Sequence, residues 1–235
     1  MSGPDQYTML MTSLPHHTSL FMSRETPLGR IKLQNRLRML DAEDAEQLRL
    51  IMEAVRWRLL QKAENDDAAL AIAHRNLTLI ESPLLQQIVR ERLELRTVVA
   101  ALRRRQRGDP SPAPHERWGF GRWLPIIRAN WSDPAFRLES AFQWLPDANR
   151  LLRKGDALGL ERLLLGTLWD QLGRASQFHF FDFEAVVIYV LRWDLIARWT
   201  SYNAEKATQR FAELMDEGLG NAAKLFDLEV SDGQQ

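Results

Sequence analysis

The sequence predicts an all-α protein, an irregular bundle of several helices that forms one body or two lobes. Three observations predict this fold class. Apolar residues return at intervals of three and four along most of the chain, which is the period of an amphipathic helix. Glycine and proline are sparse, 12 and 10 in 235 residues, and they cluster between the periodic segments. Runs that alternate between apolar and polar residues, as strands require, do not form a series.

Four helices are predicted in the first half of the chain, before the proline-rich segment at residues 108–114. Asp41 is placed as an N-cap, with Asp44 three residues later, and Pro83 begins a strongly amphipathic segment. The segment Tyr7–Pro15 is short, apolar and stopped by proline, so we expect a strand there, or an extended segment in a groove. Helices are predicted over residues 28–40, 41–64, 67–79 and 83–107.

A break between two lobes is predicted after residue 108. The residues from 108 to 114 include three prolines in five positions, which no helix interior accepts. We therefore expect an N-terminal helical lobe, a proline-rich linker, a C-terminal helical lobe and a disordered tail, at residues 1–108, 109–117, 118–228 and 229–235. Asp133-Pro134 is typical of an N-cap followed by a first-turn proline. The helices predicted after the linker are 123–129, 134–153 with a break at Pro146, 156–173, 181–200 and 203–217.

Composition excludes several classes of protein. Hydrophobic residues make up 45% and charged residues 26%, which is ordinary for a globular protein and too apolar for a disordered one. Thirty-one basic residues balance 31 acidic ones, so net charge gives no reason to expect nucleic acid or a membrane surface as a partner. The chain has no cysteine, which excludes disulfides and thiol nucleophiles and fits a reducing compartment. Because the first residues do not have the pattern of a secretory signal, we expect a cytoplasmic protein.

The most apolar segment runs from Phe183 to Trp199, and its apolar residues lie around the whole helix circumference. It is close to membrane-spanning length, but it carries charged residues that each cost about 2.5 to 3.5 kcal/mol near a bilayer centre. We therefore expect a helix buried in the middle of the fold. Asp194 and Arg198 are spaced i, i+4, so we expect a buried ion pair between them, or else a pair that faces a partner.

Glu91 is an unusual residue in the helix that begins at Pro83, because it falls within the apolar stripe. A lone carboxylate there is costly unless it is paired. We expect an arginine partner, either Arg192 or Arg198 from the apolar segment, or Arg92 or Arg96 nearby. Replacing Glu91 with alanine is then predicted to destabilise the protein by more than about 2 kcal/mol.

Arg103, Arg104, Arg105 and Arg107 form the only notable run of like charge. Two interpretations stay open. The run is either a solvated helix C-terminus, where the helix dipole favours cations, or a docking patch for the acidic surface of a protein or nucleic acid.

The residue types used in catalysis occur without the spacing that catalysis requires. The G-x-G segments at 119–121 and 218–220 lack the third glycine of a dinucleotide-binding loop. His179 is expected to be a hydrogen-bonded boundary residue, and Asp182 and Glu184 are explained as acids in the first turn of a helix. We therefore expect no catalytic residue, no metal site, no cofactor and no small-molecule substrate.

Two passages resemble a bacterial family whose genes lie within V-type ATPase operons. Residues 181–199, FDFEAVVIYVLRWDLIARW, and 203–214, NAEKATQRFAEL, resemble two successive late helices of that family. The opening segment YTMLMTSLP is similar to its first segment. Residues 93–103, LELRTVVAALR, and 184–191 resemble helices of the C-type stalk component of V-type ATPases, the counterpart of the eukaryotic d-type component. The chain departs from the C-type component at Glu94, where that protein has asparagine or a similar polar residue, and it is shorter than that three-lobed protein.

The resemblance implies a non-catalytic structural part of a V/A-type rotary ATPase, with a fold related to that of the C-type component. That component joins the central stalk to the membrane rotor ring, so the expected partners are the stalk proteins and the ring. The expected location is the cytoplasmic face of the membrane, where the complex would hold the protein peripherally. Arg103, Arg104, Arg105 and Arg107 would then meet an acidic stalk or ring surface. The alternative is a stand-alone all-α adaptor or regulatory protein that binds another protein through its basic helix end; nucleic acid is not expected as a partner.

Overall fold

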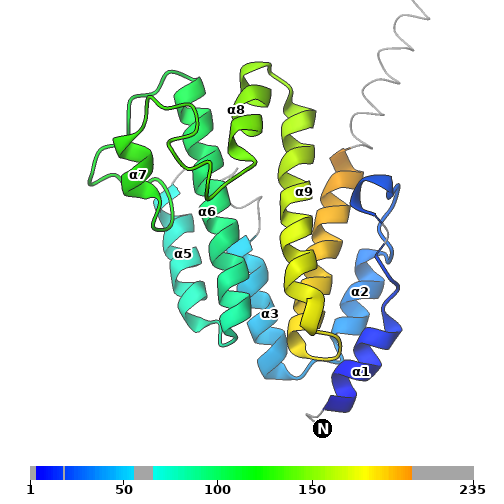
Figure 1. Ribbon diagram of the computed structural model, residues 1–235. Coiled ribbons are helices and arrows are strands. Elements are labelled where there is room, and N and C mark those ends of the chain that lie inside the picture. Colours follow the sequence, from blue (N-terminus) through cyan, green and yellow to red (C-terminus); the bar gives the residue numbers. More distant parts are fainter. Residues whose placement is uncertain (1–3, 18, 56–65, 203–235) are drawn as a thin grey trace, which may run out of the picture.

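The computed structural model describes residues 4–17, 19–55 and 66–202, and within these ranges every regular element is a helix (Figure 1). The predicted all-α class is confirmed. The predicted helix 203–217 and the predicted tail 229–235 lie outside the described residues, as does the part of the helix 41–64 that follows Val55.

The predicted helices of the first half are present, with small changes at their ends. The Asp41 carboxylate accepts a hydrogen bond from the Asp44 backbone N–H at 2.9 Å, which confirms the predicted N-cap. The elements are α1 (Pro4–Ser13), the short 3₁₀ helix η1 (Leu20–Met22), α2 (Arg30–Leu37), α3 (Ala42–Val55), α5 (Asp66–Leu79) and α6 (Pro83–Gln106).

The last element of the described residues is a long helix over residues 183–202, called here the central helix. Asp156 caps the helix before it, because its carboxylate accepts from the Gly159 N–H at 2.7 Å, and Asp182 caps the central helix through the Ala185 N–H at 2.8 Å. The preceding elements are α7 (Leu124–Ala129), α8 (Leu145–Arg153), α9 (Ala157–Ala175) and the 3₁₀ helix η2 (Ser176–Phe178).

The prediction of a strand or extended segment at Tyr7–Pro15 is wrong, because this region forms α1. Tyr7, Leu10, Met11 and Leu14 are spaced i, i+3, i+4 and i+7, which places them on one helical face. Leu10 and Leu14 are buried, and the other two side chains pack against the core. Pro4 begins the helix, at a position where the missing N–H is not needed.

The helix predicted over 134–153 forms only in its second part. Residues 132–144 are turns and short coil, and α8 begins at Leu145, so Pro146 starts a helix rather than breaking one. Phe136 and Arg137 have φ values of 54° and 56°, which an α-helix does not accept. Phe136 is fully buried against Trp131, with ring centroids 5.6 Å apart. Burial of this ring therefore outweighs the local helical signal of Asp133-Pro134.

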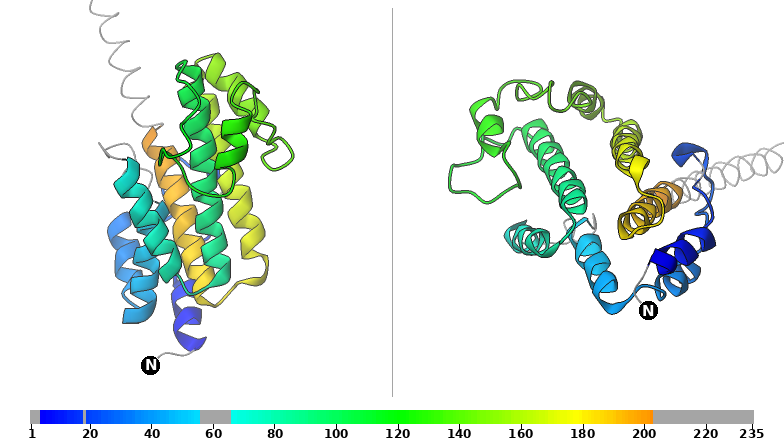
Figure 2. Two further views of the ribbon diagram at one scale, coloured as in Figure 1. Left: turned by 90° about the vertical axis from the view of Figure 1, so that its left-hand side faces the viewer. Right: turned by 60° about the horizontal axis from the view of Figure 1, so that its bottom comes forward.

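The longer helices lie along a common direction, with α1 and α2 on one flank and α7 on the opposite one (Figures 1 and 2). Ile188, Leu191 and Leu195 of the central helix are buried in the hydrophobic core, so the prediction of a buried apolar helix is confirmed. Two side chains of this helix also hold the N-terminal segment. The Tyr189 hydroxyl donates to the Pro15 carbonyl at 2.9 Å, and Trp193 Nε1 donates to the Leu28 carbonyl at 2.7 Å.

The predicted linker is a loop that is hydrogen-bonded to the helix after it. Arg128 of α7 donates to the Pro114 carbonyl at 2.8 Å, and Trp131 donates to the Asp109 carbonyl at 3.1 Å. Core residues come from both sides of this loop, and α6 contacts both α8 and α9. The division into two lobes stays a prediction.

Among the helices in the described ranges, none has both the length and the apolar character needed to cross a membrane.

Candidate binding site

The expected charge pairs of the central helix form with other partners. Arg198 binds Glu161 of α9 through Nε, and its Nη2 lies 3.1 Å from the second Glu161 oxygen. Asp194 instead faces Arg92 of α6, with 3.7 Å between Oδ2 and Nη2. The prediction of a pair between Asp194 and Arg198 is therefore wrong. Asp194 and Arg198 each pair with a residue of another helix, and the i, i+4 spacing within one helix could not predict those partners.

Glu91 is not the buried carboxylate of α6. It is partly exposed and accepts a hydrogen bond from Gln87 Nε2 at 2.8 Å, and no arginine of the described ranges pairs with it. The predicted partner Arg192 lies elsewhere, with its guanidinium 4.2 Å from the centre of the Trp169 ring. The prediction for Glu91 is wrong because α6 is covered on more of its circumference, between Arg92 and Val99, than a single apolar stripe suggests.

The buried carboxylate is Glu94, whose exposed fraction is 5%. Trp123 Nε1 donates to its Oε2 at 2.8 Å, and Arg122 Nε lies 3.9 Å from its Oε1. Arg122 also stacks over the Trp123 ring at 4.6 Å, so the three side chains form one cluster. The hydrogen bond and the cation offset the cost of removing this carboxylate from water.

Two glycines allow the segment before Trp123 to approach α6 closely. A Cβ atom at Gly119 would lie 2.5 Å from Thr97 Cγ2, and one at Gly121 would lie 2.7 Å from Glu94 Cγ. Gly121 also has φ of +95°. The Phe120 N–H, between them, donates to the Thr97 hydroxyl at 2.7 Å. The G-x-G segment therefore serves close packing of backbone against α6.

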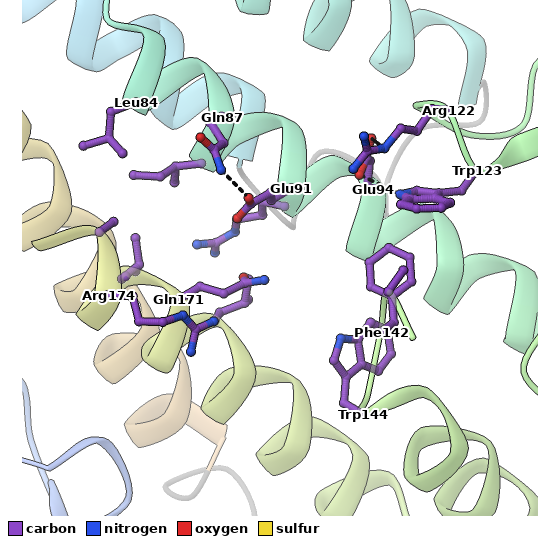
Figure 3. Close-up of a pocket in the computed structure, with 16 residues that line it drawn as sticks. Leu84, Gln87, Glu91, Glu94, Arg122, Trp123, Phe142, Trp144, Gln171 and Arg174 are labelled. Carbon is purple, nitrogen blue, oxygen red and sulfur yellow. Dashed lines mark hydrogen bonds and ion pairs between the residues drawn. The ribbon is translucent and has the colours of Figure 1, made fainter. Parts of the chain in front are cut away.

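A cavity of about 440 Å³ opens between α6 and α9, beside the Glu94 cluster (Figure 3). Glu91 on α6 and Gln171 on α9 point toward one another across it. Its wall includes a chain of aromatic rings, with centroids 5.5 Å apart for Trp123 and Phe142 and 5.7 Å apart for Phe142 and Trp144. The edge-to-face geometry of both pairs is the favoured one for aromatic side chains.

Arg92 is the most deeply buried cation in the wall of this cavity, with 4% of its surface exposed. Its Nε and Nη1 atoms have no hydrogen-bond partner among the residues that the structure describes. Burial lowers the pKa of the Arg92 guanidinium, which the Asp194 carboxylate partly opposes and Arg198 reinforces. Buried donors without partners are rare in proteins and call for an explanation.

The arginines at the end of α6 mostly have partners within the chain. Arg104 pairs with Glu116 at 2.7 Å, and Arg107 with Asp109 at 2.7 Å. Arg105 donates to the Asp133 carbonyl, to the Pro134 carbonyl at 2.7 Å and to Asn149 Oδ1 at 2.9 Å, and it covers the Phe136 ring. Arg103 is exposed beside a smaller cavity of about 200 Å³ that Glu161 also lines.

Arg104 and Arg105 therefore hold the loops after α6. A docking role stays a prediction, and it now depends mainly on Arg103 and Arg107, which are both exposed.

The opposite end of the bundle is acidic. The Tyr7 hydroxyl donates to Asp44 Oδ2 at 2.6 Å, and the Ser82 hydroxyl donates to Glu184 at 2.6 Å. Burial raises the pKa of Asp44, and Asp41, Glu184 and Glu81 raise it further, while the Tyr7 hydrogen bond lowers it. The carboxylates at this end thus lie close enough to repel one another.

His179, Asp182 and Glu184 are close enough together at this end to share a metal ion. Each is already occupied by protein groups. His179 Nδ1 lies 2.7 Å from Asp182 Oδ2, Asp182 Oδ1 caps the central helix, and Glu184 binds the Ser82 hydroxyl. The contacts of these three side chains therefore stabilise the start of the central helix.

Three phenylalanines project from the loop between α9 and the central helix. Phe178, Phe180 and Phe181 have exposed fractions of 85%, 64% and 52%. Single exposed apolar residues are common, but three aromatic rings in four residues form a patch typical of an interaction site.

Comparison of the chain with protein-family models, with curated proteins and with solved structures finds no match. The described residues form an all-helical bundle with a cavity along one side.

Proposed function

We propose that this protein is a non-catalytic structural component of a bacterial V/A-type rotary ATPase, and that it couples the central stalk to the membrane rotor ring as the C-type component does. On this proposal the complex holds it at the cytoplasmic face of the membrane. Of the segments that carry the resemblance, 93–103 lies in α6 and 181–199 lies almost wholly in the central helix; the segment 7–15 lies in and just after α1, and 203–214 is outside the described residues. α6 and the central helix are joined by Arg92 to Asp194 and by Ser82 to Glu184, so these two segments of the resemblance lie in contacting helices of the core.

A coupling part must be stiff, and the packing of the central helix supports this requirement. It is tied to α9 by Arg198 with Glu161 and by Arg192 over Trp169. Its apolar residues are buried along most of its length. Closely packed interiors have low compressibility, so a displacement at one end is carried to the other.

The observation that carries the proposal is the presence of two unlike surfaces at opposite ends of the helical bundle. Phe178, Phe180 and Phe181 lie where α9 meets the central helix, and Arg103 and Arg107 lie at the far end of α6. α6 has 24 residues, which separates its ends by about 36 Å. Two docking surfaces at this separation suit a part that joins two bodies.

The phenylalanine end fits an apolar and basic partner surface. The carboxylates of Asp182 and Glu184 follow the three rings directly, and those of Asp44 and Glu81 lie nearby. Charge complementarity across an interface steers encounter and excludes wrong partners. Exposed aromatic rings supply the apolar contact area.

The test is affinity purification of the tagged protein from detergent-solubilised membranes of its source organism. We expect stalk and ring proteins of the rotary ATPase to be retained. The double substitution Phe178→Ser with Phe180→Ser is expected to reduce their recovery at least tenfold. The matched control is Met22→Ser, because Met22 is equally exposed, at 81%, but belongs to η1.

Two outcomes would contradict the proposal. A monomer that binds neither stalk nor ring proteins at micromolar concentration excludes a role in the complex. Retention of another, single protein through Arg103 and Arg107 would support the stand-alone adaptor instead.

A further inference from the structure

We propose that the cavity between α6 and α9 binds a small organic amine that carries an aromatic ring, with the Glu91 carboxylate as the counter-ion of its ammonium group. The cavity volume of about 440 Å³ falls within the range of small-molecule sites in proteins. This proposal is independent of the proposed role in a rotary ATPase, because it depends on other residues.

Glu91 supplies the negative charge. Its side chain points from α6 into the cavity, toward Gln171 on the facing wall (Figure 3). The Gln87 amide donates to Glu91 Oε1 at 2.8 Å, and the residues that the structure describes provide no partner for Oε2. A carboxylate accepts several hydrogen bonds, and those from a charged donor are the strongest. Glu91 can therefore accept a short hydrogen bond from the ammonium group of a ligand.

An ammonium group also suits the opposite wall of the cavity. The Gln171 side chain of α9 makes no hydrogen bond within the described part of the chain, so its carbonyl oxygen can accept one. An ammonium has three N–H donors and no acceptor. Placed between Glu91 and Gln171, it would donate to both walls.

The arginines that line the cavity are paired or solvated. Arg122 lies 3.9 Å from Glu94 and offsets its charge. Arg92 faces Asp194 at 3.7 Å, and its Nε and Nη1 atoms are buried in the wall. Arg174 is exposed, so water and salt screen its charge. The carboxylate that points into the cavity from α6 is therefore free to attract a cation.

The remaining walls favour an aromatic body next to the charged group. Phe142 and Trp144 line the cavity with rings in edge-to-face contact, and their centroids are 5.7 Å apart. Leu168 and Leu172 of α9 add apolar surface. A ligand ring placed here would contact these side chains and remove its own apolar surface from water.

The test is isothermal titration calorimetry of the intact protein with indole derivatives of similar shape and different charge. We expect tryptamine, the cation, to bind one site per chain with a dissociation constant below about 1 mM. Tryptophol, in which a hydroxyl replaces the ammonium, is expected to bind at least tenfold more weakly. Indole-3-propionate, the corresponding anion, and ethylamine, which lacks the ring, are expected to give no saturable binding.

Variants locate the site at Glu91. Glu91→Gln removes the charge and keeps the size of the side chain, and is expected to weaken tryptamine binding at least tenfold. The matched control Glu43→Gln, at an exposed glutamate in the first turn of α3, leaves binding unchanged. Gln171→Leu is expected to weaken binding at least threefold. Arg174→Gln, which removes a cation from the lining, leaves binding unchanged or tightens it.

Circular dichroism melting shows whether each variant is folded, and Glu91→Gln is expected to melt like the wild type because Glu91 is partly exposed. The proposal is overturned if tryptamine does not saturate by about 1 mM. It is also overturned if indole-3-propionate binds as tightly as tryptamine, or if folded Glu91→Gln binds tryptamine like the wild type.

Discussion

The imidazole ring of His17 stacks on the phenol ring of Tyr189, with 4.0 Å between the ring centroids and 29° between the planes. Trp169 meets the same imidazole edge-on, with centroids 6.0 Å apart. Burial lowers the pKa of His17 to about 4, and the charges of Arg192 and His16 contribute to the shift. The neutral imidazole is therefore part of the contact between the N-terminal segment and the central helix.

This contact predicts acid destabilisation. The pKa of His17 in the folded state lies below the value of about 6.5 in the unfolded chain. The unfolded state therefore binds more protons between about pH 6.5 and pH 4, and stability is lost as the pH falls through this window. We expect a loss of about 2 kcal/mol, reduced from the full shift because the ring is partly exposed. Urea unfolding at pH 7 and pH 4 measures it.

The matched variants are His17→Phe, which keeps a stacked ring, and His115→Phe, which changes an exposed histidine. The first should flatten the pH dependence in this window, and the second should not. An unchanged pH dependence in His17→Phe would show that other groups cause the effect.

The corrected position of the buried carboxylate gives a second prediction. Glu94→Ala leaves the Trp123 N–H without its acceptor, and we expect a loss of about 2 kcal/mol. Glu91→Ala removes a partly exposed contact with Gln87, and we expect a loss below about 0.5 kcal/mol. Chemical denaturation of both variants decides between the two positions; equal losses would contradict the assignment of Glu94 as the buried acid.

The third prediction is that replacing Asp194 destabilises the protein more than replacing its partner Arg92. Asp194→Ala leaves the buried guanidinium without a counter-ion, and we expect a loss of about 2 kcal/mol, since Asp194 itself is 39% exposed. Arg92→Met replaces the cation with an apolar side chain of similar length, and we expect a smaller loss. Thermal melts of both variants test this order. A larger loss for Arg92→Met would mean that the ion pair is a net source of stability.

The loops after α6 give a fourth prediction. Arg105→Ala removes contacts to two carbonyls, to Asn149 and to the Phe136 ring, and is expected to cost about 2 kcal/mol. Arg107→Ala removes one exposed pair with Asp109 and is expected to cost less than about 0.5 kcal/mol. Hydrogen exchange of residues 131–144 should rise in the first variant and not in the second. Equal protection in both would contradict a structural role for Arg105.

Local patterns predicted most of the helices but not the partners of charged residues. The caps at Asp41 and before α9, and the apolar circumference of the central helix, depend on residues close in sequence. α1 also had a local signal, the i, i+3, i+4, i+7 spacing from Tyr7 to Leu14, which its short length obscured.

The candidate site could not be predicted in the same way, because it is built from segments far apart in the chain. Glu94 meets Trp123 across 29 positions, and Arg92 meets Asp194 from another helix. Which carboxylate of α6 is buried depends on how the segment 119–123 crosses the helix. The G-x-G spacing at 119–121 was the available sequence signal for that crossing. Both glycines are needed there because a Cβ atom would collide with side chains of α6.

The two hydrogen bonds from the central helix to the N-terminal segment both end on main-chain oxygens, those of Pro15 and Leu28. Every amino acid provides such an acceptor, so these contacts hold the backbone at Pro15 and at Leu28 without requiring a particular side chain at either position. Related chains could therefore vary this segment widely while Tyr189 and Trp193 stay constant. A comparison of such sequences would then show a variable segment although its backbone is held by the same two hydrogen bonds in each protein.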